Sequence, residues 1–338
     1  MELAPAKLRP LNIGDILDAM FRLYRSNFLT FVGVAALAQL PLLILQLALQ
    51  VGLGGRFTAD LLSLTQELNF FDPSSDSLAD LPLGSIPVFI IVSLVLSLIQ
   101  FAVVQQLVSG ALTNAIARSY LGQPTSVLGA YQLGAGRISA LIGAGLLVSL
   151  FGVIAFAIFF AIYIGAIFLI VGVASAGESS FAVVAAVLGV IAVFGLLLVA
   201  LIGLLFLWLR FLFITQAIVV EEKGAFAAIA RSWRLIRGSF WRTLGIYLLL
   251  TLLVQVIVGV PVGTASFAIN SAIGSPTDPL DNFVLRQSLI NIIAYTAQIL
   301  ILPLQLTAFT LLYYDLRVRK EGYDLELRSA ESAGARYE

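Results

Sequence analysis

The chain has 338 residues, 60% of them hydrophobic and 11% charged, and its mean hydropathy is +1.03. Soluble domains carry about 25% charged residues, so this composition excludes a soluble globular protein and indicates an integral membrane protein. The 19 basic and 19 acidic residues cancel, which argues against a nucleic-acid partner, and cysteine and histidine are absent, so we expect no metal site and no cofactor.

The first predicted element is an amphipathic helix that begins near the N-terminus. Apolar residues recur there at the three- and four-residue spacing of one helical face: Ile13, Ile16, Leu17, Met20, Phe21 and Tyr24. Arg22 and Arg25 lie off this face, and Asn12 is a suitable N-cap. The preceding segment lacks the pattern of a secretory signal, so we expect the next apolar run to be retained as a span.

Six apolar runs are long enough to cross a bilayer, which needs about 20 residues per helix. They cover residues 28–53, 86–112, 139–172, 181–209, 241–262 and 287–313. The third run is longer than a membrane requires, so we expect that helix to tilt, to kink near Gly165 or to project from the bilayer. The predicted fold class is an all-α membrane protein with six transmembrane helices.

Charge is divided unequally between the connections of these runs. The three odd-numbered loops are acidic and contain only Arg56 and Arg286 as basic residues, whereas the N-terminus, the even-numbered loops and the C-terminal tail hold all the others. By the positive-inside rule, both termini and the even-numbered loops are predicted to be cytoplasmic.

An arginine-bearing amphipathic stretch followed by an apolar run occurs three times in the chain. The superposed copies share an arginine and, eight residues later, a glycine: Arg25 and Gly33, Arg137 and Gly145, Arg237 and Gly245. This predicts one membrane domain of three parallel two-span repeats, each preceded by a cytoplasmic interfacial helix. The repeats and the cytoplasmic tail would cover residues 1–122, 123–223, 224–320 and 321–338.

The arginines of these stretches are candidates for contact with lipid headgroups. They are Arg22, Arg25, Arg137, Arg231, Arg234 and Arg237. Helices on the cytoplasmic surface would direct them toward phosphate, and each contact with anionic lipid is worth about 1 kcal/mol. The alternative is that they only enforce orientation, as basic residues beside spans ordinarily do.

Three segments carry a resemblance to a known family: LRPLNIGDILDAMFRLYRSNF, EEKGAFAAIARSWRLIRGSFW and LLYYDLRVRKEGYDLEL. Together they resemble the membrane domain named after the membrane-anchored glycerophosphoryl diester phosphodiesterases of bacteria. The resemblance implies a location in the bacterial plasma (inner) membrane. Some members carry a metal-binding catalytic barrel after this domain. Because the sequence after the last span is short and lacks histidine, we expect the membrane domain alone and no hydrolase activity.

Uncharged amides are the main polar groups inside the predicted spans. The candidates for a polar interior are Gln39, Gln46, Gln50, Gln100, Gln255, Asn291, Gln298 and Gln305. They either hold spans one, two, five and six together by hydrogen bonds or line a polar path, where Pro41, Pro261 and Pro303 could break the helices. Spans three and four have no amide, so they would face lipid, a protein partner or a second copy of the chain.

The sequence pairs no nucleophile with a base, so we expect no enzyme. The favoured hypothesis is a non-enzymatic polytopic membrane protein that acts as a scaffold, assembly or lipid-associated subunit, with arginine-bearing helices at the cytoplasmic face. The alternative is a transporter or channel for a small or amphiphilic solute, which would pass through the amide-lined region between spans one, two, five and six.

Overall fold

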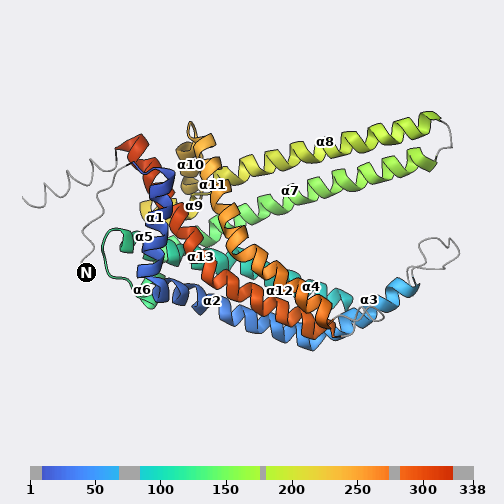
Figure 1. Cartoon of the computed structure of the whole chain (residues 1–338), viewed down its shortest axis with the longest axis horizontal. Helices are drawn as coiled ribbons and strands as arrows, with labels where there is room; N and C mark the ends of the chain where they lie inside the picture. The colour runs from blue at the N-terminus through green and yellow to red at the C-terminus, as the bar shows by residue number, and fades with distance from the viewer. Residues whose placement is uncertain (1–9, 68–83, 176–179, 274–281, 323–338) are drawn as a thin grey trace, which may run out of the picture.

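The computed structural model describes residues 10–67, 84–175, 180–273 and 282–322 (Figure 1). Within these ranges all regular structure is helical. Six helical rods in the described chain are long and apolar enough to cross a membrane, which confirms the predicted fold class. They are Phe28–Ser63, Ile86–Tyr120, Gly136–Gly165, Val187–Glu221, Phe240–Ile273 and Phe283–Glu321.

Several rods consist of more than one helix, and η marks a π-helical segment. In chain order the elements of the rods are α2 (Phe28–Leu49), η1 (Gln50–Gly54), α3 (Gly55–Glu67), α4 (Ile86–Ile99), η2 (Gln100–Val104), α5 (Gln105–Tyr120), α7 (Ala135–Ser175), α8 (Ser180–Phe211), α9 (Ile214–Glu221), α11 (Phe240–Val254), η3 (Gln255–Gly259), α12 (Val260–Ile273) and α13 (Phe283–Glu321). Three shorter helices precede the first, third and fifth rods: α1 (Ile13–Ser26), α6 (Val127–Tyr131) and α10 (Ala225–Ile236).

The short helices gather at one end of the molecule. Figure 1 shows α1, α6, α9 and α10 at this end, and α3 and the tips of α7 and α8 at the opposite end. The even-numbered rods finish beside the short helices, on residues with left-handed backbone: Gly122 (φ 75°), Glu222 (φ 55°) and Gly322 (φ 65°). These turns recur at equal intervals along the chain, while the threefold symmetry of the repeats stays a prediction.

The hydrophobic core lies at the end that holds the short helices. The C-terminal half of α13 is at its centre, where Tyr313 and Tyr314 are buried. Ile16 and Met20 of α1 belong to the same cluster of buried side chains as Tyr313. Because each buried apolar side chain contributes about 1.5–3 kcal/mol, this packing fixes α1 against the ends of the rods.

The apolar faces of α1 and α10 are only partly buried. On α1, Ile16, Met20 and Leu23 are buried, whereas Phe21 is exposed. On α10, Ile236 is buried but Phe226 and Trp233 are exposed. Both helices therefore present aromatic side chains, as well as arginines, on the outside of the molecule.

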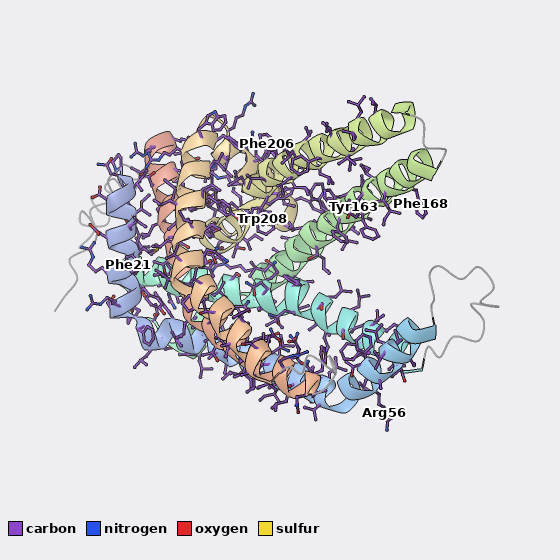
Figure 2. All side chains as sticks on the ribbon, turned by 45° about the vertical axis from the view of Figure 1, so that its right-hand side comes forward. Phe21, Arg56, Tyr163, Phe168, Phe206 and Trp208 are labelled. Carbon is purple, nitrogen blue, oxygen red and sulfur yellow. The ribbon has the colours of Figure 1, made fainter. Side chains whose placement is uncertain are left out.

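The third and fourth rods form a hairpin that diverges from the other four (Figures 1 and 2). The most apolar windows of α7 and α8 are 6% and 0% buried, against 17–33% for the other rods. Their exposed side chains include Phe156, Phe168 and Phe194. An apolar surface of this kind is costly in water and matches the hydrocarbon of a membrane.

The long third run is one uninterrupted helix, α7, of 41 residues. At 1.5 Å per residue it extends about 60 Å, roughly twice the hydrocarbon thickness of a bilayer. Of the three predicted outcomes, the kink near Gly165 is wrong, because regular helix continues through that glycine. The two predicted outcomes that remain for the excess length are a tilt of the helix and its projection from the bilayer.

Prolines do not break the helices as the sequence suggested they could. Pro41 lies inside α2 and Pro303 inside α13, while Pro261 is the second residue of α12. The irregular turns are instead the π-helical segments, which start at Gln50, Gln100 and Gln255. Such segments insert one residue into a helical turn and often occur at functional sites. Figure 1 shows the fifth rod changing direction between α11 and α12, on either side of η3.

Candidate functional site

The six predicted headgroup arginines divide into two groups at the end that holds the short helices. Arg22, Arg25, Arg234 and Arg237 are exposed on α1, on α10 and directly after α10. Arg137 and Arg231 instead make ion pairs within the chain. Arg137 pairs with Glu222, whose side chain is 68% exposed, so this contact is a surface pair of small net stability.

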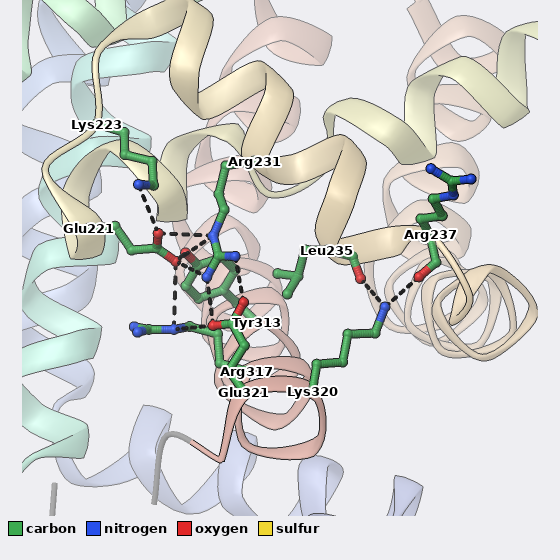
Figure 3. A network of polar contacts seen from close by, with 9 residues as sticks. All are labelled: Glu221, Lys223, Arg231, Leu235, Arg237, Tyr313, Arg317, Lys320 and Glu321. Atoms are coloured by element: carbon green, nitrogen blue, oxygen red, sulfur yellow. Dashed lines mark hydrogen bonds and ion pairs between the residues drawn. The ribbon is translucent and has the colours of Figure 1, made fainter. Parts of the chain in front are cut away.

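Arg231 is the centre of a polar network that joins α9, α10 and α13 (Figure 3). Its Nε donates to Glu221 Oε2 at 2.9 Å, and its Nη1 donates to Glu321 Oε1 at 2.5 Å. Tyr313 donates its hydroxyl hydrogen to Glu221 Oε1. Lys223 lies 3.5 Å from Glu221 Oε2. The hydrogen bond to Glu321, followed by that to Glu221, raises the pKa of Arg231. Its guanidinium is therefore held as a cation that fastens helices together.

A further carboxylate, Asp315, is fully buried on α13, the helix that also carries Tyr313 and Glu321. Leu11 N donates to Asp315 Oδ1 at 2.7 Å, and Arg319 Nε donates to the same oxygen at 2.9 Å. Arg242 Nη2 lies 3.0 Å from Asp315 Oδ2 and donates to Leu11 O at 2.8 Å. The chain entering α1 is thus clamped to α11 and α13.

An amide-lined cavity of about 290 Å³ lies in the half of the rods that is opposite the short helices, and we name it the outer cavity. It lies between the first, second and sixth rods, and its polar lining consists of Gln46, Gln50, Ser93, Ser97, Gln287 and Asn291. Gln287 Nε2 donates to Asn291 Oδ1 at 3.3 Å, and Asn291 Nδ2 donates to Gln50 Oε1 at 2.8 Å. Aromatic rings form part of its wall, where Phe57 stacks on Phe89 with ring centroids 4.3 Å apart. None of its described lining residues is charged.

The predicted amides do not all meet in this cavity. Gln39 is fully buried, and neither of its amide atoms has a hydrogen-bond partner among the described residues. Gln100 is buried, with its Oε1 likewise unpartnered in the described chain. Gln255 is exposed on η3, with its amide against Gly259. Gln298 is half-buried.

Gln305 lines a different cavity, together with two glutamines of α5. The structure therefore brings Gln46, Gln50 and Asn291 together and separates them from Gln305. The single amide-lined region expected between the first, second, fifth and sixth spans is divided into separate polar sites.

The comparison with protein families identifies one match. A family described as "Domain of unknown function (DUF7847)" covers residues 11–316, which include all six rods except the last turn of α13. The chain belongs to this family. No curated protein and no solved structure matches it.

Two functional features of this DUF7847 chain were not predicted from its sequence. The outer cavity is completed by Ser93, Ser97 and Gln287. Their part in the lining is known only from their folded positions opposite Gln46 and Gln50. Asp315 was not singled out either. Its signal in the sequence is an acidic residue that ends a long apolar run and lies four residues before Arg319.

Proposed function

We propose that this DUF7847 chain is a non-enzymatic, lipid-associated scaffold or assembly subunit of the bacterial plasma membrane, with both termini in the cytoplasm. One observation carries the proposal: exposed arginines and exposed aromatic rings lie together on α1 and α10, at one end of six apolar rods. Arginine beside aromatic residues is the combination that binds the headgroup region of a membrane.

The arginines that remain available to lipid are Arg22, Arg25, Arg234 and Arg237. Phe21 accompanies the first pair, while Trp233 and Trp241 accompany the second, with 38% and 80% of the two indole side chains exposed. Anionic lipid would gain about 1 kcal/mol for each arginine near the surface. Arg137 and Arg231 make ion pairs within the chain, so the proposal gives them the role of holding the end with the short helices together.

We also propose that the chain is related to the membrane domain of glycerophosphoryl diester phosphodiesterases, without their catalytic barrel. The α7–α8 hairpin adds further support, because its exposed apolar length suits contact with lipid tails or with a membrane partner.

The test replaces Arg22, Arg25, Arg234 and Arg237 by glutamine in one variant and measures the anionic lipid that copurifies with the protein by native mass spectrometry. We expect the variant to lose bound anionic lipid. Arg56→Gln is the matched control, because Arg56 is exposed at the opposite end of the molecule (Figure 2). Equal lipid content in the fourfold variant and the unmodified protein would overturn the proposal.

A second candidate function is transport of a small uncharged solute. The outer cavity of about 290 Å³, with six uncharged polar side chains around it, favours this candidate. Its test by cysteine labelling is argued in the Discussion.

A further inference from the structure

Two cavities adjoin where the α7–α8 hairpin meets the other rods. The first, of about 320 Å³, is lined by apolar and aromatic side chains of α7 and α8 and by Tyr247 of α11. The second, of about 260 Å³, lies between α5, α7, α8, α9 and α13. Val148, Trp208 and Phe211 line both cavities. A molecule could therefore extend from one cavity into the other past these three side chains.

The second cavity is polar where the first is apolar. Gln105, Gln106, Ser109, Thr215 and Gln305 reach it from three helices. Within the described chain the side-chain amides of Gln105 and Gln305 have no hydrogen-bond partner. Among the described residues, Gln106 Nε2 donates only to Phe101 O, at 3.5 Å. Unpaired amides inside apolar spans are costly, so hydroxyl or carbonyl oxygens placed here would be bound favourably.

The linings of both cavities exclude a charged headgroup. None of the described residues that line them is charged. The nearby Arg210 is directed elsewhere: its guanidinium lies 4.7 Å from the ring centroid of Trp233 and donates to Trp233 O at 3.2 Å. A phosphate bound among these glutamines would thus be desolvated without a cation, at a large cost in free energy.

Lipid has lateral access to this place. The apolar surface of the hairpin is exposed along its length, and Figure 2 shows Trp208 where the hairpin joins the rest of the molecule. Trp208 is 54% exposed. Phe151 contacts Phe211 edge to face, with ring centroids 5.6 Å apart, and gives the apolar cavity an aromatic wall. A hydrocarbon chain lying along the hairpin could enter without crossing a polar barrier.

We propose that the two joined cavities bind an uncharged lipid of the diacylglycerol class. One acyl chain lies in the cavity between α7, α8 and α11. The ester oxygens accept hydrogen bonds from the amides of Gln105, Gln106 and Gln305, and the hydroxyl donates to an amide oxygen of the same residues. The site goes beyond the lipid association proposed above, because it takes an uncharged lipid whereas the exposed arginines take anionic headgroups.

The test uses the full chain in phosphatidylcholine nanodiscs with a diacylglycerol that carries a diazirine in its acyl chain. A phosphatidylglycerol with the same label is the charged comparator. We expect the diacylglycerol to label α7 and α8, and the double variant Gln105→Leu with Gln305→Leu to lower this labelling about tenfold, while the phosphatidylglycerol labelling stays unchanged. Gln298→Leu is the matched control, since Gln298 is on α13 but lines neither cavity.

A second variant addresses the apolar cavity. Leu204→Trp fills the space beside α7 and is expected to cause the same loss, whereas Leu198→Trp, at an exposed position of α8 outside the cavity, is not. The proposal is overturned if both lipids label the hairpin equally, or if neither cavity variant lowers the diacylglycerol labelling. If the cavity variants leave the diacylglycerol labelling unchanged and the fourfold arginine variant loses anionic lipid, this site alone is rejected. If the cavity variants lower the labelling and the arginine variant keeps its anionic lipid, the arginine surface is rejected.

Discussion

Leu11 and Asp315 are joined by a hydrogen bond of 2.7 Å between the backbone N–H of Leu11 and Asp315 Oδ1, across 304 positions of the sequence. The match to the DUF7847 family begins at Leu11 and ends directly after Asp315, at residue 316. The two residues therefore close the family domain at the end that holds the short helices. Arg242 and Arg319 supply the positive charge that this buried carboxylate requires.

Asp315→Asn is expected to destabilise the protein by about 3 kcal/mol, because two arginines would then face a neutral amide in a buried place. Thermal unfolding in detergent would measure the loss, and limited proteolysis would detect release of the segment before α1. Asp18→Asn is the control, since Asp18 is an exposed acidic residue of α1. Similar unfolding temperatures for both variants would contradict the clamp.

The glycines that follow the repeated arginines are expected to differ in their tolerance of a side chain. A Cβ at Gly145 would lie 2.4 Å from Gln106 Cγ and 3.0 Å from Ala102 O, so Gly145→Ala forces α7 away from η2 at a cost of about 1–3 kcal/mol. A Cβ at Gly245 meets nothing within 4 Å, and Gly245→Ala should stabilise its helix by up to about 1 kcal/mol. Thermal unfolding of the two variants compares them directly, and equal effects would show that the packing at Gly145 is not close.

Tyr131 is expected to make the stability of the protein fall at alkaline pH. Its hydroxyl donates to Val34 O at 2.7 Å, and burial raises its pKa to about 12. In the unfolded chain the tyrosine pKa is about 10. The contribution of the neutral phenol is therefore complete below pH 10 and is lost as the pH rises from 10 to 12.

Tyr131→Phe should lower stability by about 1 kcal/mol at neutral pH and reduce the fall above pH 10. Unfolding temperatures between pH 7 and 12 measure both effects. Tyr163→Phe, at an exposed position of α7, is the control. A pH profile that Tyr131→Phe leaves unchanged would exclude this tyrosine as the cause.

The six spans could be predicted because each apolar run is long and the signal is local. Interactions across the fold could not be predicted in this way. Asp315 and Leu11 are far apart in sequence, and no periodicity relates them. Likewise Arg231 has the sequence context of a lipid-facing arginine, and only the folded positions of Glu221 and Glu321 assign it to an ion-pair network.

The amides illustrate a second limit of sequence interpretation. Spacing along one helix places Gln39, Gln46 and Gln50 on a common face, but a shared face does not give a shared partner. Gln39 lies 11 residues before Gln50, which is about 16 Å along the helix axis. Gln50 bonds Asn291 in the outer cavity, whereas Gln39 is buried away from it. A helical period contains no information about which side chains of other rods meet the face at each level.

Cysteine labelling distinguishes the scaffold hypothesis from the transporter hypothesis, because the chain contains no cysteine of its own. Gln46 lines the outer cavity, while Gln298 lies further along α13 and lines none of the described cavities. We expect Gln46→Cys to react with a membrane-impermeant maleimide added outside, and Gln298→Cys to resist the reagent from either side. Gln123→Cys, at an exposed position beyond α5, is the positive control for the side of the short helices, which the proposed function assigns to the cytoplasm. Reaction at both Gln46→Cys and Gln298→Cys would indicate a water-filled path between the rods, and the transporter would then replace the scaffold as the function of the amides.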